Sequence, residues 1–403
     1  MSWQKTTLGE TVDLLAGFAF KSAQFTDEPD GVRLLRGDNI AQGLTRWDGV
    51  KRWPQANVAG LERYWLKKDD VVLAMDRPWI EAGLKFASIR DADLPSLLVQ
   101  RVARLRSKAA LDQVFLKYVI AAKAFTDHVQ AITTGANVPH ISGRDILAYS
   151  FELPRLGVQR RIADILSAYD DLIENNTRRI AILEDMARRL FAEWFGQGVE
   201  ADWPTVKLGT LAAINPEAIK PKSPPARIGY IDIASVSPGK VDQVQWMDFA
   251  EAPGRARRIV RNGDVIWSNV RPNRRSFALL LDVDQNTIAS TGFSVLRAKT
   301  VPWSYLYVAI TTSEFTAYLT NRAKGSAYPA VGSEDFADAD VLRPTDETLR
   351  RFHDHVGPML ELAARLNVQS ANLRTTRDLL LPKLISGEIE VRAVEKEMEA
   401  AAA

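Results

Sequence analysis

The sequence contains no cysteine and only four histidines among its 403 residues. The absence of cysteine excludes disulfide bonds, thiolate metal sites and a cysteine nucleophile. His353 and His355 lie two positions apart in a helical pattern, so they point to different faces and are poorly placed to share a metal ion. We therefore expect no metal site. The lack of cysteine also fits a reducing cytoplasm, where we expect the protein to act.

Long apolar runs and catalytic signatures are missing as well. No run of about 18 uncharged apolar residues is present, so no membrane-spanning helix is expected, and residues 1–5 open no hydrophobic signal segment. The sequence has neither a phosphate-binding loop ending in Gly-Lys-Ser/Thr nor a glycine-rich dinucleotide fingerprint. Asn215-Pro216-Glu217 lacks the second proline and the aromatic residue of the adenine-methyltransferase motif. These absences favour a non-catalytic chain that binds no cofactor.

What the sequence does contain is an internal repeat with a period of about 190 to 200 residues. The matching segments keep their order along the chain, and this is hard to obtain by chance. The clearest pairs are Asp70-Val71-Val72 with Asp264-Val265-Ile266, Arg77-Pro78 with Arg271-Pro272, Gly135-x-x-x-Pro139 with Gly325-x-x-x-Pro329, and Pro154 with Pro344. Asp70 and Asp264 stand in turn-like segments before apolar runs, so we interpret them as structural residues.

Each copy divides into a globular part and a long helix. In the globular parts, short apolar runs such as Val71–Met75 and Ile228–Ile231 alternate with helical patches such as Leu111–Val129 and Trp303–Arg322, a pattern that predicts mixed α/β (α+β) domains. The predicted divisions are a first domain at 1–155, a central helix at 156–200, a second domain at 201–345, a distal helix at 346–395 and a tail at 396–403.

The two long helices carry apolar residues at heptad spacing. Each spans about 40 residues, far more than an ordinary helix, so we expect them to pack against each other as an antiparallel coiled-coil pair that separates the two domains. Asn176 is a polar residue within this pattern and can set its register. The predicted seam consists of Leu166, Ile173, Asn176, Ile180, Leu183, Leu190, Val356, Met359, Leu366, Leu373 and Leu380.

Arginine-rich segments are the candidate partner surface. Residues 255–275 hold seven arginines and one acid, and arginine suits phosphates and guanine edges because its planar fork donates two parallel hydrogen bonds. A solvated surface loop is the alternative interpretation. The candidate DNA-binding residues are Lys21, Arg33, Arg36, Arg77, Trp79, Asn137, Arg144, Arg271, Arg274, Arg275, Lys324 and Tyr328.

The whole arrangement resembles the specificity subunit of type I restriction-modification enzymes. Besides the Gly-x-x-x-Pro loops, the resemblance rests on Gly17–Ser22, Leu35–Ile40, Leu384–Glu388 and the proline before each long helix. It implies two target-recognition domains that each read one half of a split, asymmetric double-stranded DNA site. It also implies two modification subunits that methylate adenine with S-adenosylmethionine, and motor-nuclease (restriction) subunits that join for cleavage.

The helix starts depart from the family pattern, which often has Pro-Pro-x-x-Glu-Gln. This chain keeps Pro154 and Gln159 in the first copy and only Pro344 in the second, which puts strict symmetry of the two partner interfaces in doubt. Two other functions compete with the leading one: a DNA-binding scaffold of another defence or regulatory complex without methylation, and an enzyme with two pseudo-symmetric active sites. The missing catalytic motifs disfavour the enzyme.

Overall fold

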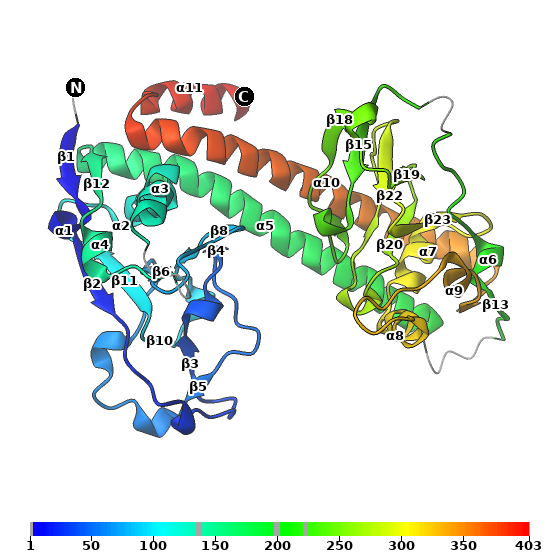
Figure 1. The fold of residues 1–403 in the computed structure, drawn as a ribbon, viewed down its shortest axis with the longest axis horizontal. Coiled ribbons are helices and arrows are strands. Elements are labelled where there is room, and N and C mark those ends of the chain that lie inside the picture. Colours follow the sequence, from blue (N-terminus) through cyan, green and yellow to red (C-terminus); the bar gives the residue numbers. More distant parts are fainter. Residues whose placement is uncertain (1–2, 134–138, 197–201, 221–223, 403) are drawn as a thin grey trace. The chain divides into compact units, whose positions relative to one another are not determined.

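The computed structural model describes residues 3–133, 139–196, 202–220 and 224–402. The chain forms two compact units, each described by itself below. Unit 1 comprises residues 1–173 and 372–403, and unit 2 comprises residues 174–371. Each unit therefore takes one part of each long helix, so that the helices belong to both units (Figure 1).

The strands of unit 1 form a five-stranded sheet, a three-stranded sheet and two smaller pairs. They are β1 (Gln4–Thr7), β2 (Val12–Ala16), β3 (Val32–Leu35), β4 (Gln42–Gly43), β5 (Arg52–Trp53), β6 (Val71–Ala74), β7 (Trp79–Ile80), β8 (Gly83–Leu84), β9 (Phe86–Ser88), β10 (Ser96–Leu98), β11 (Val102–Ser107) and β12 (Ser150–Leu153). The sheet orders are β2-β11-β6-β9-β4 and β10-β3-β5, and β1 pairs with β12 and β7 with β8. All four residues of β6 are buried, as expected for an entirely apolar strand between two neighbours.

Short helices cover the sheets of unit 1. They are α1 (Leu8–Thr11), η1 (Ser22–Gln24), η2 (Gly37–Asn39), η3 (Gln55–Asn57), η4 (Glu62–Tyr64), η5 (Asp91–Asp93), α2 (Gln113–Ala121), α3 (Lys123–Ile132) and α4 (Gly143–Leu147). The helical patch expected over Leu111–Val129 is thus two helices, because the chain is extended at Ala122. The Asp112 carboxylate caps α2 by accepting hydrogen bonds from the backbone N–H groups of Val114 and Phe115.

Unit 2 repeats this plan. Its elements before the distal helix are β13 (Thr205–Lys207), α6 (Leu208–Leu211), β14 (Ala212–Ile214), β15 (Arg227–Ile231), η6 (Ile233–Ser235), β16 (Val236–Ser237), β17 (Lys240–Val241), β18 (Gln245–Asp248), η7 (Phe249–Glu251), β19 (Ala256–Ile259), β20 (Val265–Ser268), η8 (Pro272–Arg274), β21 (Phe277–Leu279), β22 (Thr287–Ser290), β23 (Phe293–Ala298), α7 (Trp303–Ile310), α8 (Ser313–Arg322), α9 (Ser333–Ala337) and β24 (Asp340–Leu342). The sheet orders are β14-β23-β20-β21 and β18-β15-β22-β19. β15 pairs in parallel with β22, just as β3 pairs in parallel with β10, so the duplication holds in the fold.

The two long helices are α5 (Leu156–Phe195) and α10 (Asp346–Ser386), of 40 and 41 residues. In unit 2, Asn176 of α5 donates a side-chain hydrogen bond to Gln369 of α10 at 3.2 Å, and the rings of Phe195 and Phe352 lie 5.1 Å apart. A later residue of α5 thus meets an earlier residue of α10, so the helices run antiparallel there. Every residue of the predicted seam is buried or half-buried. The mixed α+β fold with a packed long-helix pair is confirmed.

The sequence marks Gly387 as a helix stop, although the predicted distal helix extends to residue 395. α10 ends at Ser386 rather than 395, because Gly387 has a φ of 74° and stops the helix. A separate helix, α11 (Val391–Ala402), follows where a tail was expected. It packs onto unit 1 through the buried Val391 and Val394 and through an ion pair between Glu395 and Arg161 of α5. None of the described helices is long and apolar enough to cross a membrane.

Candidate nucleic-acid interface

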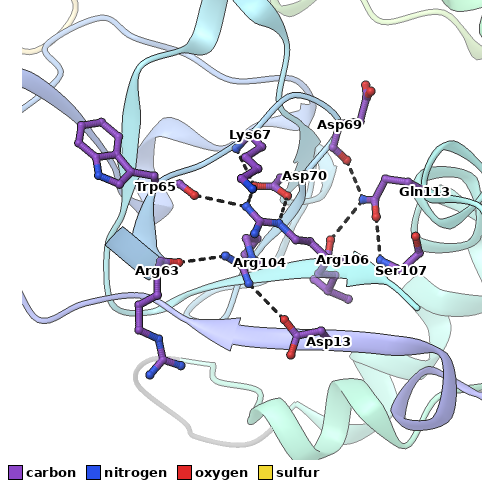
Figure 2. Close-up of polar contacts among 11 residues, drawn as sticks. Asp13, Arg63, Trp65, Lys67, Asp69, Asp70, Arg104, Arg106, Ser107 and Gln113 are labelled. Carbon is purple, nitrogen blue, oxygen red and sulfur yellow. Dashed lines mark hydrogen bonds and ion pairs between the residues drawn. The ribbon is translucent and has the colours of Figure 1, made fainter. Parts of the chain in front are cut away.

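A buried ion pair fixes the central strands of unit 1 (Figure 2). Asp70, only 3% exposed, accepts hydrogen bonds from Arg106 Nε at 2.5 Å and Arg106 Nη2 at 2.8 Å. The same carboxylate accepts the backbone N–H of Lys67 at 2.8 Å, which closes the turn before β6. These hydrogen bonds raise the pKa of the Arg106 guanidinium. The pair therefore ties the start of β6 to β11.

Two further side chains extend this network on either side of the pair. Arg104 donates to the Arg63 carbonyl at 3.0 Å and to the Asp13 carboxylate at 3.2 Å, which links β11 to β2 and to the loop before β6. Gln113 of α2 donates to the Asp69 carbonyl at 2.7 Å. Figure 2 shows that these contacts come from several elements of the domain. Their partners lie within the fold, so the network supports the domain rather than offering a free binding surface.

Unit 2 contains the same ion pair. Asp264 is fully buried and accepts hydrogen bonds from Arg297 Nε at 2.8 Å and Nη2 at 2.7 Å, together with the Arg261 backbone N–H at 2.8 Å. Glu217 adds a second carboxylate that pairs with both Arg297 and Arg261. The hydrogen bonds from these two arginines lower the pKa of Glu217. Asp70 and Asp264 are thus structural residues, as their turn context predicts.

Beyond each central strand the chain makes a strained corner. Arg77 and Arg271 have φ angles of 45° and 50°, in the left-handed region, although each precedes a proline. Such a conformation costs an ordinary residue on the order of 1–3 kcal/mol, and a following proline restricts the residue further. Each arginine donates its backbone N–H to a proline carbonyl, Pro139 at 2.6 Å or Pro329 at 2.7 Å. The same unusual conformation therefore recurs at equivalent positions of the two units.

In unit 1 this corner gathers groups that the sequence analysis did not single out as binding residues. Asp76 accepts a hydrogen bond from His140 Nδ1 at 2.6 Å and lies 3.6 Å from the exposed Arg101 guanidinium. The Met75 backbone N–H donates to the Arg101 carbonyl at 2.8 Å, which fixes Arg101 beside the end of β6. Arg101 has a φ of 68°. No residue pattern predicts this conformation, so Arg101 escaped the sequence analysis.

In unit 2 an aromatic residue joins the corner. The Arg271 guanidinium lies 4.7 Å from the ring centre of Tyr328, and it donates to the Ala327 carbonyl at 3.1 Å. Tyr328 is 70% exposed, so the stacked pair faces solvent. The loop is closed by two backbone hydrogen bonds between Lys324 and Ala330, both 2.9 Å long. The structure therefore brings three predicted residues, Arg271, Lys324 and Tyr328, to one place.

The two arginines that follow differ in their surroundings. Arg275 is half-buried, and its guanidinium donates to the Thr311 carbonyl at 2.9 Å. Arg274 is exposed, and its guanidinium makes no hydrogen bond or ion pair with the described residues. Arg274 can therefore reach an outside partner without giving up a contact within the chain.

The remaining predicted residues of unit 1 are not gathered at one place by the structure. Arg33 of β3 donates to the Ala92 and Leu94 carbonyls at 3.0 and 2.6 Å and stacks on Trp47, so its side chain already serves the fold. Burial lowers its pKa. Arg33 is consequently the least suitable DNA contact among the predicted residues.

The four other predicted residues of unit 1 differ in their surroundings. Arg36 pairs with Asp38 at 3.4 Å. Lys21, before η1, and Arg144, in α4, are exposed, and neither makes a hydrogen bond or ion pair with the described residues of the Arg77 corner. Asn137 lies outside the described residues. Among the predicted residues of unit 1 that the structure describes, Arg77 and Trp79 are therefore the ones at this corner.

The described residues contain no group of three or more histidines, aspartates and glutamates placed to hold a metal ion. The geometry instead offers two equivalent surface corners, each on a rigid sheet and each with arginine and aromatic side chains. Guanidinium groups bind phosphates and guanine edges, and aromatic rings make apolar contact with bases. This arrangement suits a nucleic-acid partner.

Comparison with known proteins identifies the class. Residues 2–185 match the family model described as the type I restriction modification DNA specificity domain. Two curated relatives are specificity subunits. The Type I restriction enzyme EcoAI specificity subunit of Escherichia coli is 38% identical over 173 residues, and the MjaVIII specificity subunit of Methanocaldococcus jannaschii is 30% identical over 189 residues. These matches span 43% and 47% of this chain, but only 28% and 44% of the relatives.

A solved structure extends the likeness to the whole chain. The S subunit of a type I restriction-modification system from M. genitalium matches with a TM-score of 0.58 and 16% identity, over 96% of each chain. At that identity the match shows a shared fold. The chain is therefore similar to type I restriction-modification specificity subunits in the sequence of its first half, and it shares the fold of a solved member over its whole length.

Proposed function

We propose that this chain is the sequence-specific DNA-recognition subunit of a type I restriction-modification complex. Each globular domain would read one half of a bipartite, asymmetric site in double-stranded DNA. The observation that carries this proposal is the duplicated corner, in which a strained arginine is tied to a proline loop in both domains. Because the corners differ in the side chains around these arginines, they are suited to different half-sites.

The partners we propose are two modification subunits and, for cleavage, motor-nuclease subunits. Exposed apolar side chains on the long helices support a partner role, because a docked partner would remove their apolar surface from water. In unit 1 these are Leu172 and Leu379, which are 48% and 62% exposed. In unit 2 Ile182 and Val368 are 58% and 56% exposed. The modification subunits would dock on these helices.

In this assembly the chain itself would be non-catalytic and would bind no cofactor. S-adenosylmethionine would bind to the modification subunits, which would methylate adenine in the site chosen by this chain. We propose that the complex acts in the cytoplasm, where the DNA of a bacterial or archaeal cell is found. A DNA-binding scaffold without methylation is the second candidate function, and the same experiment separates the two.

Methyl transfer tests the proposal directly. The purified full chain is incubated with DNA and labelled S-adenosylmethionine, first alone and then with the modification subunit of a type I restriction-modification system. We expect no transfer by the chain alone and transfer to one bipartite sequence with the partner. Transfer by the chain alone would overturn the non-catalytic assignment. Sequence-specific binding that never directs methylation would favour the scaffold function.

A further inference from the structure

The loop after the strained arginine differs between the two units in length and chemistry. Leu73 pairs with Phe86 in unit 1, and Trp267 pairs with Phe277 in unit 2, so these pairs mark equivalent positions. Seven residues, 79–85, lie between the corner proline and the paired phenylalanine in unit 1, against four, 273–276, in unit 2. The shorter loop holds two arginines. The longer one folds into the β7–β8 hairpin.

The β7–β8 hairpin presents apolar side chains to solvent. Trp79 pairs with Leu84, and Ile80 pairs with Gly83. Leu84 is 5% exposed and anchors the hairpin in the core, whereas Trp79 and Ile80 are 39% and 40% exposed. A two-stranded ribbon has the width that the major groove of DNA admits, and the thymine methyl group in that groove is recognised by apolar contact. The hairpin thus has the shape and the surface of a base-reading element.

Two cations stand at the stem of this hairpin. Arg77 precedes it, and Lys85 ends it by donating its backbone N–H to the Pro78 carbonyl at 2.7 Å. Burial lowers the pKa of the Lys85 ammonium group, and the positive charge of Arg77 lowers it further, although Asp38 acts in the opposite direction. An anionic phosphate placed between Arg77 and Lys85 would reduce their mutual repulsion. The charges therefore favour a nucleic-acid backbone at the base of the hairpin.

We propose that the β7–β8 hairpin enters the major groove of the first half-site and places Trp79 and Ile80 against thymine methyl groups. The Arg77–Lys85 stem would hold the flanking phosphates. Glu81, at the tip, would accept a hydrogen bond from a cytosine amino group. Unit 2, with its arginine turn in the same place, would read its half-site through hydrogen bonds instead. This inference rests on the proposed DNA-recognition function.

The test removes single methyl groups from the DNA. The full chain first selects its target from a pool of random duplexes, and each thymine of the selected site is then replaced by deoxyuridine, which lacks only the 5-methyl group. We expect the wild-type chain to bind about fourfold more weakly at one or two positions of a single half-site, because one buried methyl group stabilises by about 0.8 kcal/mol. The W79A/I80A variant should bind more weakly overall and lose this methyl effect.

A matched control comes from unit 2. Val244 and Trp246 are 36% and 42% exposed, so V244A/W246A removes a comparable apolar surface. This variant should keep the methyl effect, and thermal unfolding should show that both double variants remain folded. A wild-type chain that selects a site but shows no methyl effect would overturn the inference and leave the proposed function standing. A chain that selects no sequence would overturn the proposed function itself. An equal methyl effect in wild type and W79A/I80A would also overturn the inference. So would a fluorescence increase from 2-aminopurine placed in the site, without any methyl effect, because it would show that the protein unstacks bases rather than contacting thymine methyl groups.

Discussion

The two globular domains share their buried framework and differ at their exposed corners. Asp70 with Arg106 and Asp264 with Arg297 occupy the same place in the fold, with nearly the same hydrogen-bond lengths. The corners share one strained arginine each, but unit 1 adds a hairpin with Trp79 and unit 2 adds a turn rich in arginine. A duplicated domain can therefore acquire a new specificity at its loops while its framework stays unchanged.

The helix pair shows a second contrast between the units. In unit 1, Asp170 of α5 pairs with Lys117 of α2 at 2.5 Å and with Arg377 of α10 at 2.6 Å. In unit 2, the equivalent role falls to aromatic packing, in which Phe195 lies 5.1 to 5.4 Å from the rings of Phe352, Tyr305 and Trp203. Unit 1 thus adds half-buried charge pairs to the apolar packing of its helices, whereas unit 2 adds a cluster of aromatic rings. The two halves should respond differently to acid.

The largest expected effect comes from breaking the buried ion pair of unit 1. D70N should lower the stability of unit 1 by about 3–5 kcal/mol, because Arg106 loses its only carboxylate partner among the described residues while remaining half-buried. D264N should cost less, about 1–3 kcal/mol, because Glu217 still pairs with Arg297. Hydrogen exchange measured by mass spectrometry reports the two units separately.

D69N is the matched control, because asparagine tolerates the left-handed conformation of Asp69, whose φ is 66°. It should leave the exchange of unit 1 nearly unchanged. In addition, E217Q combined with D264N should bring unit 2 close to the loss seen for D70N in unit 1. Equal losses for D70N and D264N, with no further effect of E217Q, would refute the role given to Glu217.

A smaller effect is expected at the helix pair of unit 1. Burial raises the pKa of Asp170, but its contacts with Lys117 and Arg377 outweigh burial and lower it overall. A carboxyl group whose pKa is lower in the folded state than in the unfolded state stabilises the fold. This stabilisation is complete above the unfolded-state pKa of about 3.9, and it is lost as the pH falls through the folded-state pKa. D170N should therefore cost about 2–3 kcal/mol at neutral pH, since the pair is partly exposed. It should also flatten the acid dependence of unit 1 below about pH 4.

Asp171, the exposed neighbour of Asp170 on α5, provides the control. Urea unfolding followed by hydrogen exchange at pH 7 and at pH 3 should distinguish D170N from D171N most strongly at the higher pH and show a smaller difference at the lower one. An effect of D170N that persists undiminished at pH 3 would mean that Asp170 acts through packing rather than charge.

Much of the fold could be predicted from the sequence. The offset of 194 residues between the two Asp and Arg-Pro segments revealed the duplication, and the heptad spacing located both long helices. α10 runs through Gly357 and Pro358 without a break. Val356 and Leu360, which flank this pair in the helix, are buried in the core of unit 2 and hold the helix there. α11 was missed because the segment after Gly387 is short and highly charged, although Val391, Val394 and Met398 recur in it at helical spacing.

The candidate interface was harder to predict, because it depends on backbone conformation rather than residue type. Arg77 and Arg271 were found through their arginine and proline pattern, but nothing in that pattern indicates a positive φ. Arg33 was a candidate for the same role, yet the carbonyls of Ala92 and Leu94, some 60 residues away, occupy its guanidinium. Contacts between distant segments therefore decide which arginines are free, and a single sequence does not contain them.

The central claim is that the two equivalent corners each read one half of the same DNA site. The most direct test compares R77Q and R271Q, both at exposed or half-exposed corners outside the buried framework. Each full-length variant selects its preferred sequence from random duplexes, beside the wild type. We predict that R77Q loses base preference in one half-site and R271Q in the other, by about 1–3 kcal/mol at the affected positions. If both variants lost preference in the same half-site, or if both weakened binding uniformly without changing the selected sequence, the claim would be contradicted.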